Sequence, residues 1–188
     1  MARVKKLCPQ FHMSLQSGCT PTLRRMRRVY TAEEYAVVVK KMREAFQGFV
    51  SFTTDVIVGF PGETEEDFAE SVRFVVEQKH LKVHVFPYSR RSGTPAADFP
   101  DQIPEHEKSL RVHRLQTAAD EVRGQIITDL LGSEDTVLLE KPLSSTLFTG
   151  YTRLYVPVVV SAPGCSAGQI VNARLESWDG ERCRARMV

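Results

Sequence analysis

Three segments of the chain have the pattern of β-strands. Apolar and polar residues alternate from Phe11 to Gln16, which predicts a strand with one apolar and one polar face. Two further runs, Phe49 to Phe60 and Leu81 to Tyr88, are mostly apolar and are followed by turn residues, as is typical of buried strands. The first half of the chain therefore has three predicted strands.

Two helices are predicted between the first and second strands. A short one follows Ser17-Gly18 and carries Leu23 and Met26. The next begins at a capping box formed by Thr31 and Glu34. Its apolar stripe and its expected end are Tyr35, Val38, Val39, Met42 and Phe46, followed by Gly48.

A second capped helix is predicted from about Thr64 to Lys79, with Asp67 completing the cap. Its buried stripe is Phe68, Val72, Val75 and Val76. The order strand, helix, strand, helix, strand predicts parallel strands joined by right-handed crossovers. Because three strands cannot close a barrel, the predicted fold class is α/β, with a partial (β/α) barrel remnant.

The pattern changes after an extended, proline-containing loop over residues 91–105. Residues 107–131 read as one long amphipathic helix with the stripe Val112, Leu115, Ala119, Val122 and Ile126. Short β-rich runs follow at residues 136–140, 154–160, 169–176 and 182–188, separated by Gly150, Pro163-Gly164 and Asp179-Gly180.

This close spacing of turns predicts a small antiparallel β-barrel, with Asp179-Gly180 as its clearest hairpin turn. The predicted domains are residues 1–105 for the barrel remnant, 106–131 for the connecting helix and 132–188 for the small barrel.

Composition and charge leave this picture in place and exclude several classes of protein. The 188 residues are 42% hydrophobic and 26% charged, with a net charge of +2, which is ordinary globular material. Seven cationic residues precede Glu33, the first acid, so the start of the chain is either a phosphate-binding surface or a solvated cationic face: Arg3, Lys5, Lys6, Arg24, Arg25, Arg27 and Arg28. No run approaches the length of a membrane span, and no signal segment is present, so a cytoplasmic, reducing setting is expected.

Metal and nucleophile patterns are absent from the sequence. Cys8, Cys19, Cys165 and Cys183 fit neither a paired CxxC zinc site nor a CxxxCxxC cluster motif, and the five histidines have no ligand spacing. No Gly-x-Ser-x-Gly elbow surrounds a serine. We therefore predict no metal site in this chain.

The loops after the three parallel strands are the best candidates for a ligand site, because strand ends of a (β/α) barrel converge at one mouth. Gln16 can hydrogen-bond a ribose or an adenine edge, Arg28 can grip a carboxylate, and Asp55 can accept from an ammonium group. The alternative for Gln16 and Asp55 is a satisfied polar network inside the barrel, and the alternative for Arg28 is a solvent-facing position. Arg91, in the loop after Tyr88, suits a phosphate or nucleobase.

The predicted C-terminal barrel has aromatic residues around a cation. Phe148, Tyr151 and Tyr155 surround Arg153 in the sequence, a mixture that stacks bases and neutralises phosphate in oligonucleotide-binding barrels. The same rings also suit a barrel core. A modest RNA-binding role is predicted here.

Several motifs together resemble one family. They are Leu15-Gln16-Ser17-Gly18, Met26 to Thr31, Thr54 to Thr64, Tyr88 to Ala96 and Gly150-Tyr151-Thr152, in this order. The chain resembles the C-terminal part of a radical SAM tRNA methylthiotransferase that ends in a TRAM domain. The segment His84 to Ser89 and the arginines after it look closest to the threonylcarbamoyladenosine branch.

The resemblance implies S-adenosyl-L-methionine and 4Fe-4S clusters as cofactors of the parent protein and tRNA as its partner. The cluster-binding cysteines are absent from this chain and are expected upstream of Met1, so the fragment alone is expected to be inactive. By position, the cofactor side is assigned Gln16, Ser17, Arg28, Asp55, Gly59 and Gly62. The RNA side is assigned Tyr88, Arg91, Tyr151 and Arg153.

Two other interpretations stay open at the level of sequence. The chain is either a non-catalytic RNA-binding protein that uses its basic start and its small barrel, or an unrelated α/β enzyme. The latter would bind a phosphorylated metabolite at Gly59 to Gly62, where glycines allow close approach of a ligand to the backbone.

Overall fold

The computed structural model describes residue 4, residues 6–47 and residues 49–188, and it divides into two compact units. The α/β unit contains residues 11–48 and 52–122, and the barrel unit contains residues 1–10, 49–51 and 123–188. Gly48, the predicted helix end, and the cationic residues Arg3 and Lys5 lie outside the described residues.

The sheet of the α/β unit consists of three strands in the order β1, β2, β3. They are β1 (Gln10–His12), β2 (Ser51–Val58) and β3 (Lys82–Pro87). β2 and β3 are parallel, in a register that runs from Thr53 opposite Lys82 to Val58 opposite Pro87. The predicted α/β class with a parallel sheet is confirmed.

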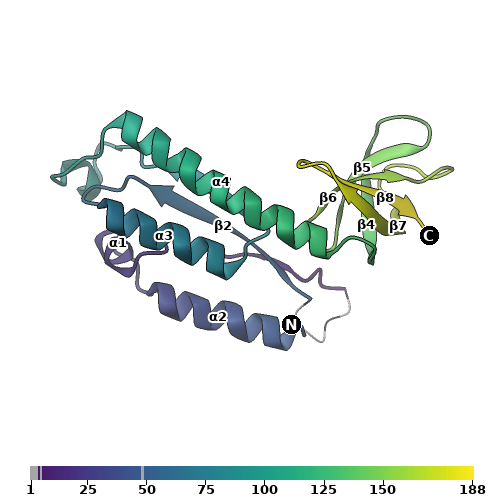
Figure 1. Cartoon of the computed structure of the whole chain (residues 1–188), viewed down its shortest axis with the longest axis horizontal. Coiled ribbons are helices and arrows are strands. Elements are labelled where there is room, and N and C mark those ends of the chain that lie inside the picture. The colour runs from purple at the N-terminus through teal and green to yellow at the C-terminus, as the bar shows by residue number, and fades with distance from the viewer. Residues whose placement is uncertain (1–3, 5, 48) are drawn as a thin grey trace. The chain divides into compact units, whose positions relative to one another are not determined.

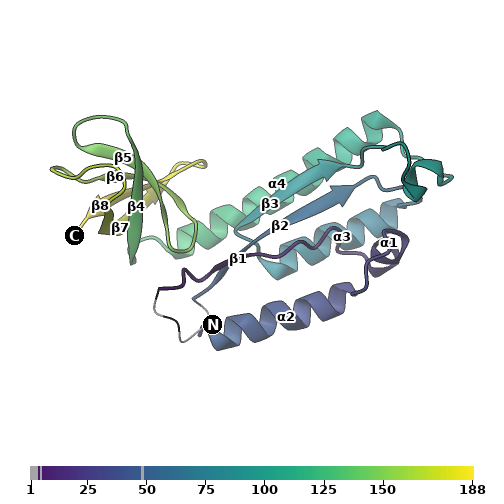
Figure 2. The same ribbon diagram turned by 180° about the vertical axis from the view of Figure 1, so that it is seen from behind.

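Helices cover one face of this sheet. They are α1 (Thr20–Arg25), α2 (Ala32–Ala45), α3 (Glu65–Gln78) and α4 (Glu105–Asp129), with a 3₁₀ turn at Pro95–Asp98. Figure 1 shows α2, α3 and the first part of α4 in front of the strands, and Figure 2 shows the same strands from their uncovered side. Both predicted capping boxes, Thr31 with Glu34 and Thr64 with Asp67, are present.

The first strand is shorter than the alternation from Phe11 to Gln16 predicted. After Met13, whose N–H donates to Thr53 O, the amide of Leu15 donates to the hydroxyl group of Thr54 at 2.9 Å, and that hydroxyl donates to Met13 O at 2.7 Å. The hydroxyl group of Thr54 therefore replaces a backbone carbonyl as the acceptor for the Leu15 amide. Regular pairing resumes at Gln16, which forms a parallel bridge with Val56.

Three details of the predicted helix stripes are wrong. Val38 and Val76 are 45% and 37% exposed, because each lies at the border of its helix's apolar face. Near the end of α4 the fully buried isoleucine is Ile127, one position after the predicted Ile126. Toward its N-terminus the same helix buries two cations that the periodicity did not identify, Lys108 and Arg111.

The barrel unit contains a closed five-stranded barrel in the order β4, β5, β6, β8, β7. Its strands are β4 (Glu134–Pro142), β5 (Leu147–Thr152), β6 (Pro157–Ser161), β7 (Ile170–Trp178) and β8 (Cys183–Met187). The predicted small barrel is confirmed. Most neighbouring strands are antiparallel, whereas β6 and β8 pair in parallel.

The hairpin at Asp179-Gly180 is also confirmed, since it joins the antiparallel strands β7 and β8. Gly180 has a φ of 98°, and the carboxylate of Asp179 accepts the amides of Glu181 and Arg182 at 2.8 and 2.7 Å. These bonds close the turn, in the way that aspartate commonly does.

The interpretation of Gly150 as a separator between strands is wrong. Gly150 lies within β5, a strand that the sequence did not predict, and pairs with Leu139. A Cβ atom at this position would lie 2.0 Å from the carbonyl oxygen of Leu138, so the two strands approach each other only because residue 150 has no side chain. None of the described helices is long and apolar enough to cross a membrane.

Candidate ligand cavity at the strand ends

A cavity of about 560 Å³ lies in the α/β unit where the three strands end. Five of the residues singled out from the sequence line it: Gln16, Arg28, Asp55, Tyr88 and Arg91. The remaining wall is mainly apolar: Met26, Ile57, Phe60, Phe86, Pro87, Ser89, Thr94 and Ala96. The loops after β1, β2 and β3 thus contribute to one concave surface, as expected for the ends of parallel strands.

Gln16 is fixed in the cavity wall by its backbone. Its N–H donates to Asp55 O and its carbonyl accepts from Ile57 N–H, both at 2.8 Å. Its φ of 69° lies in the left-handed region, which is sparsely populated for residues other than glycine. Strain of this kind persists where the surrounding structure holds it, and it clusters at ligand sites.

Asp55 belongs to a row of ionisable residues across the uncovered face of the sheet. His12 Nε2 lies 3.3 Å from Asp55 Oδ2, and His84 is directly opposite Asp55 in the β2–β3 register. The His12 and His84 rings are 6.5 Å apart. Burial and the positive charge of Lys82 lower the pKa of His84, against the opposing effect of Asp55. His12 thus contacts one oxygen of the Asp55 carboxylate, and Asp55 also lines the cavity.

Arg28 and Arg91 place two guanidinium groups on the cavity wall. Arg28 follows α1, where its amide donates to Leu23 O at 2.9 Å and ends the helix. Arg91 lies in the loop after β3, and its carbonyl accepts from Thr94 N–H and from the Thr94 hydroxyl group. Both arginines are exposed, so their charge is open to an anionic ligand.

Tyr88 lines the cavity with an unusual polar group. The residue is only 9% exposed, and its hydroxyl oxygen is buried with no hydrogen-bond partner among the described residues. Its ring meets Phe60 edge-on, with the ring centroids 5.2 Å apart. An unsatisfied buried hydroxyl is costly, and a polar ligand atom would satisfy it.

Ser17, Gly59 and Gly62 do not line the cavity. The Ser17 hydroxyl group accepts from Cys19 N–H at 3.2 Å at the start of α1. The amide of Gly59 donates to both carboxylate oxygens of Glu63, at 3.1 and 3.2 Å, and the amide of Gly62 donates to Asp101 O. Both glycine amides thus donate to groups of the protein. They are not available to a phosphate, which weakens the interpretation of Gly59 to Gly62 as a phosphate site.

Sequence reasoning did not identify the charged residues behind the cavity. Arg111 pairs with Glu63, and Lys108 donates to the carbonyl of Tyr88. Burial raises the pKa of Glu63, while the amide of Gly59 and the guanidinium of Arg111 oppose that rise. A signal was present, since Lys108 and Arg111 continue the stripe of Leu115 toward the N-terminus of α4 at helical spacing.

In the barrel unit, Tyr151 and Tyr155 form a stacked pair with ring centroids 4.6 Å apart. Tyr155 is 41% exposed and has a left-handed φ of 68°. Arg153 instead bonds the buried carboxylate of Asp135 at 2.6 Å and lies over the ring of Phe49. The tyrosines therefore offer a surface for stacking, whereas Arg153 is engaged within its own unit.

The residues present do not fit an iron-sulfur cluster. Cys19 and Cys183 are buried, Cys8 is exposed and Cys165 is partly exposed, and all four are free thiols. In the part of the chain that the structure describes, no group of three or more Cys, His, Asp or Glu side chains has the arrangement to hold a metal ion. The cavity, by contrast, combines cations, a carboxylate and aromatic rings, which suits a small zwitterionic ligand with an aromatic part.

Comparison with known proteins supports the same family. The model of the Radical SAM superfamily matches residues 1–75. The threonylcarbamoyladenosine tRNA methylthiotransferase MtaB of Bacillus subtilis is 40% identical over 92% of this chain, and that of Thermotoga maritima is 36% identical over 99%. The tRNA-2-methylthio-N(6)-dimethylallyladenosine synthase of Clostridium novyi is 39% identical over 93%.

The chain spans only about two fifths of the length of these relatives, 39% of the Bacillus and Clostridium proteins and 43% of the Thermotoga protein. The predicted resemblance is nevertheless confirmed along nearly its whole length. The chain is thus similar, over nearly its whole length, to part of the radical SAM tRNA methylthiotransferases, and its first 75 residues match the Radical SAM superfamily.

Proposed function

We propose that the cavity binds S-adenosyl-L-methionine and that the chain is the C-terminal portion of a radical SAM tRNA methylthiotransferase. The observation that carries the proposal is the convergence of Gln16, Asp55, Arg28 and Arg91 from separate loops on one cavity. We assign residues 1–105 to the radical SAM barrel, residues 106–131 to a connecting helix and residues 132–188 to a TRAM-like domain. Since the substrate is a tRNA, we place the protein in the cytoplasm.

The lining residues match the parts of this ligand. A guanidinium such as that of Arg28 pairs with the carboxylate, and the side chain of Asp55 accepts from the ammonium group. Gln16 and the unpartnered hydroxyl group of Tyr88 offer hydrogen bonds to the ribose and the adenine. Phe60 supplies an apolar wall on which the adenine packs, and Arg91 remains for the substrate.

S-adenosyl-L-methionine bound in this cavity would supply an adenosyl group for radical chemistry in the parent protein. The residues of this chain bind and orient that ligand and keep water from its adenosine part. Because the four cysteines do not fit a cluster, we derive no step through one, and we propose that the chain alone is catalytically inactive.

We further propose that the modified base is N6-threonylcarbamoyladenosine next to the anticodon, to which a methylthio group is added. The support is the segment His84 to Ser89 and the naming of two relatives as threonylcarbamoyladenosine enzymes. Since relatives named for dimethylallyladenosine are about equally similar, overall identity favours neither base.

Calorimetric titration of S-adenosyl-L-methionine into the chain tests the proposal. Arg28→Met and Asp55→Asn should each weaken binding about tenfold or more, because each removes a hydrogen bond to a charged ligand group. Arg24→Met is the matched control, since Arg24 is an exposed arginine that does not line the cavity. Absence of binding by the unaltered chain, or equal effects of Arg24→Met and Arg28→Met, would remove the proposal.

A second candidate function is RNA binding by the barrel unit, favoured by the exposed stacked pair of Tyr151 and Tyr155. Stacking of a base on such a ring contributes roughly 1–3 kcal/mol. Tyr155→Ala should therefore weaken tRNA binding by about tenfold without changing its dependence on salt, because no charge is removed. Identical affinities of the two proteins for tRNA would exclude a role of this ring.

A further inference from the structure

Lys108, near the start of α4, places its ammonium group against the end of β3. Its Nζ donates to Tyr88 O at 3.0 Å, pairs with Glu105 Oε1 at 2.7 Å and lies 5.4 Å from the centre of the Tyr88 ring. The side chain is only 4% exposed. Burial of an ammonium group is unfavourable unless its donors are used, and here one is used on Tyr88, a residue of the cavity wall, and another on Glu105.

The stem of Lys108 also contacts the end of β2. A Cβ atom at Gly59 would lie 2.5 Å from Lys108 Cγ, so the lysine stem packs directly on the Gly59 backbone. Gly59 has a φ of 71°, which further favours glycine there. One side chain of α4 therefore touches the ends of both β2 and β3.

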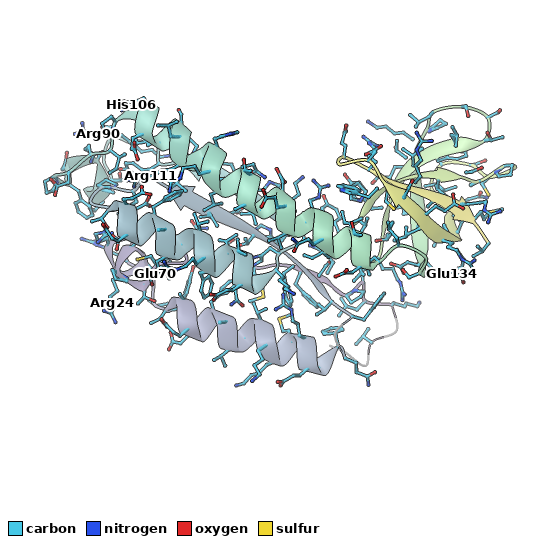
Figure 3. All side chains as sticks on the ribbon, viewed as in Figure 1. Arg24, Glu70, Arg90, His106, Arg111 and Glu134 are labelled. Carbon is cyan, nitrogen blue, oxygen red and sulfur yellow. The ribbon has the colours of Figure 1, made fainter. Side chains whose placement is uncertain are left out.

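Arg111, three residues further along α4, fixes the turn after β2 through a carboxylate. Its Nη1 donates to Glu63 Oε1 at 2.8 Å and to Glu63 O at 3.0 Å, and Glu63 accepts the amide of Gly59. Figure 3 shows Arg111 on the side of α4 toward α3, and its guanidinium lies 5.4 Å from the centre of the Phe68 ring. Arg111 thus fixes the backbone of Gly59 indirectly, through the carboxylate of Glu63.

We propose that Lys108 and Arg111 are positioning residues for the cavity: they fix the ends of β2 and β3, and thereby the places of Phe60 and Tyr88 on its wall. The inference rests on the proposed function, in which the ligand is S-adenosyl-L-methionine. Neither cation lines the cavity, so any effect on the ligand passes through the residues that they hold.

Stability alone does not call for charges at these two positions. A buried ion pair replaced by apolar side chains of similar volume is often as stable or more so. Charged donors instead provide direction, since each bond is made to one atom in one geometry. Besides bonds to Glu105 and Glu107 within α4, the two cations bond Tyr88 O, Glu63 O and the Glu63 carboxylate, which lie in the segments that follow β3 and β2.

Titration of S-adenosyl-L-methionine into the whole chain tests the role of Lys108. Lys108→Met keeps the stem on Gly59 and removes the donor, and it should weaken binding about tenfold. Arg114→Met, on the same helix, removes an exposed cation that pairs with Glu65 and should bind as the unaltered chain does. A folded Lys108→Met variant with unaltered affinity overturns the proposal.

The Glu63–Arg111 pair gives an independent test by rescue. Arg111→Met leaves the Glu63 carboxylate unpaired and should weaken binding. In Glu63→Gln/Arg111→Met the amide oxygen of glutamine still accepts from Gly59 N–H without a buried charge, so affinity should return to within about threefold of the unaltered chain. If Lys108→Met does not fold, this double variant still tests the positioning role. A double variant that folds and binds as weakly as Arg111→Met overturns the proposal.

Hydrogen exchange at the Gly59 amide separates this inference from the proposed function, because it needs no ligand. Exchange should be about tenfold faster in Arg111→Met than in Arg114→Met. If the unaltered chain binds no S-adenosyl-L-methionine, the proposed function fails even where exchange responds. If binding occurs and neither binding nor exchange responds to the variants, the positioning role alone fails.

Discussion

Glu63 and Arg111 form an ion pair in which the two side chains are only 3% and 6% exposed, with Nη1 and Oε1 2.8 Å apart. Removing one partner leaves an uncompensated buried charge, so Arg111→Met should lower the free energy of unfolding by about 3–5 kcal/mol. Glu63→Gln/Arg111→Met should recover most of that loss. Urea denaturation at pH 7 measures both, with Arg114→Met as the exposed control, expected within about 1 kcal/mol of the unaltered chain.

A second prediction concerns His80, whose pKa is lowered to about 4 by burial and by the positive charge of Arg43. An unfolded histidine titrates near 6.5, so the folded chain binds this proton less tightly, and stability present above pH 6.5 is lost as pH falls toward 4. His80 should therefore account for a loss on the order of 3 kcal/mol between pH 7 and pH 4. His80→Gln should flatten the curve of unfolding free energy against pH over this window, whereas His113→Gln, at an exposed site, should not. Parallel curves for all three proteins would contradict the assignment.

A third prediction concerns the thiols. Burial raises the pKa of Cys19 to about 11, and burial also raises the pKa of Cys183. At pH 8 only roughly one Cys19 side chain in a thousand is then a thiolate, the form that reacts with alkylating agents. Iodoacetamide should label Cys8 and Cys165 in the folded protein and reach the other two only in urea, as peptide mass spectrometry will show. Rapid labelling of Cys19 without urea would be inconsistent with its burial.

A fourth prediction concerns the close approach of β4 and β5 at Gly150. Gly150→Ala places a methyl group against Leu138 O and should destabilise the chain by about 1–3 kcal/mol. Gly124→Ala is the matched control in the same unit, since its nearest neighbour would be Trp178 Nε1 at 3.8 Å, and alanine favours a helix by up to about 1 kcal/mol. Thermal unfolding of both variants tests the contrast, and it fails if Gly150→Ala melts like the unaltered chain.

Local signals predicted much of the fold. The capping boxes at Thr31 and Thr64 combine a side chain with an acid three residues later, a pattern that is complete within one turn and independent of distant contacts. The turn at Asp179-Gly180 is similarly local. Gly150 was misread because its role depends on Leu138, a residue on the neighbouring strand that the sequence alone does not place beside it.

The location of the site could be predicted because the carboxyl ends of parallel strands lie at the same edge of a sheet. That rule brought Gln16, Asp55 and Arg91 to one cavity. Sequence reasoning gave no account of Lys108 and Arg111, because cations on an amphipathic helix normally face solvent, and only their bonds to Tyr88 and Glu63 explain their burial. Ser17, Gly59 and Gly62 are close in sequence to residues that line the cavity. The hydroxyl group of Ser17 and the amides of the two glycines are instead hydrogen-bonded to other groups of the protein.

The hydroxyl group of Thr54 determines the backbone path between Met13 and Gln16, because it bonds both the Leu15 amide and the Met13 carbonyl. It shifts the pairing by one residue, so that Gln16 rather than Leu15 bonds Asp55 O. A valine at 54 would match the shape but deprive the Leu15 amide of its acceptor, and the backbone would be free to follow the flat path of an ordinary strand. The hydroxyl group of one threonine thus determines that Gln16, rather than its neighbour, lies in the cavity wall.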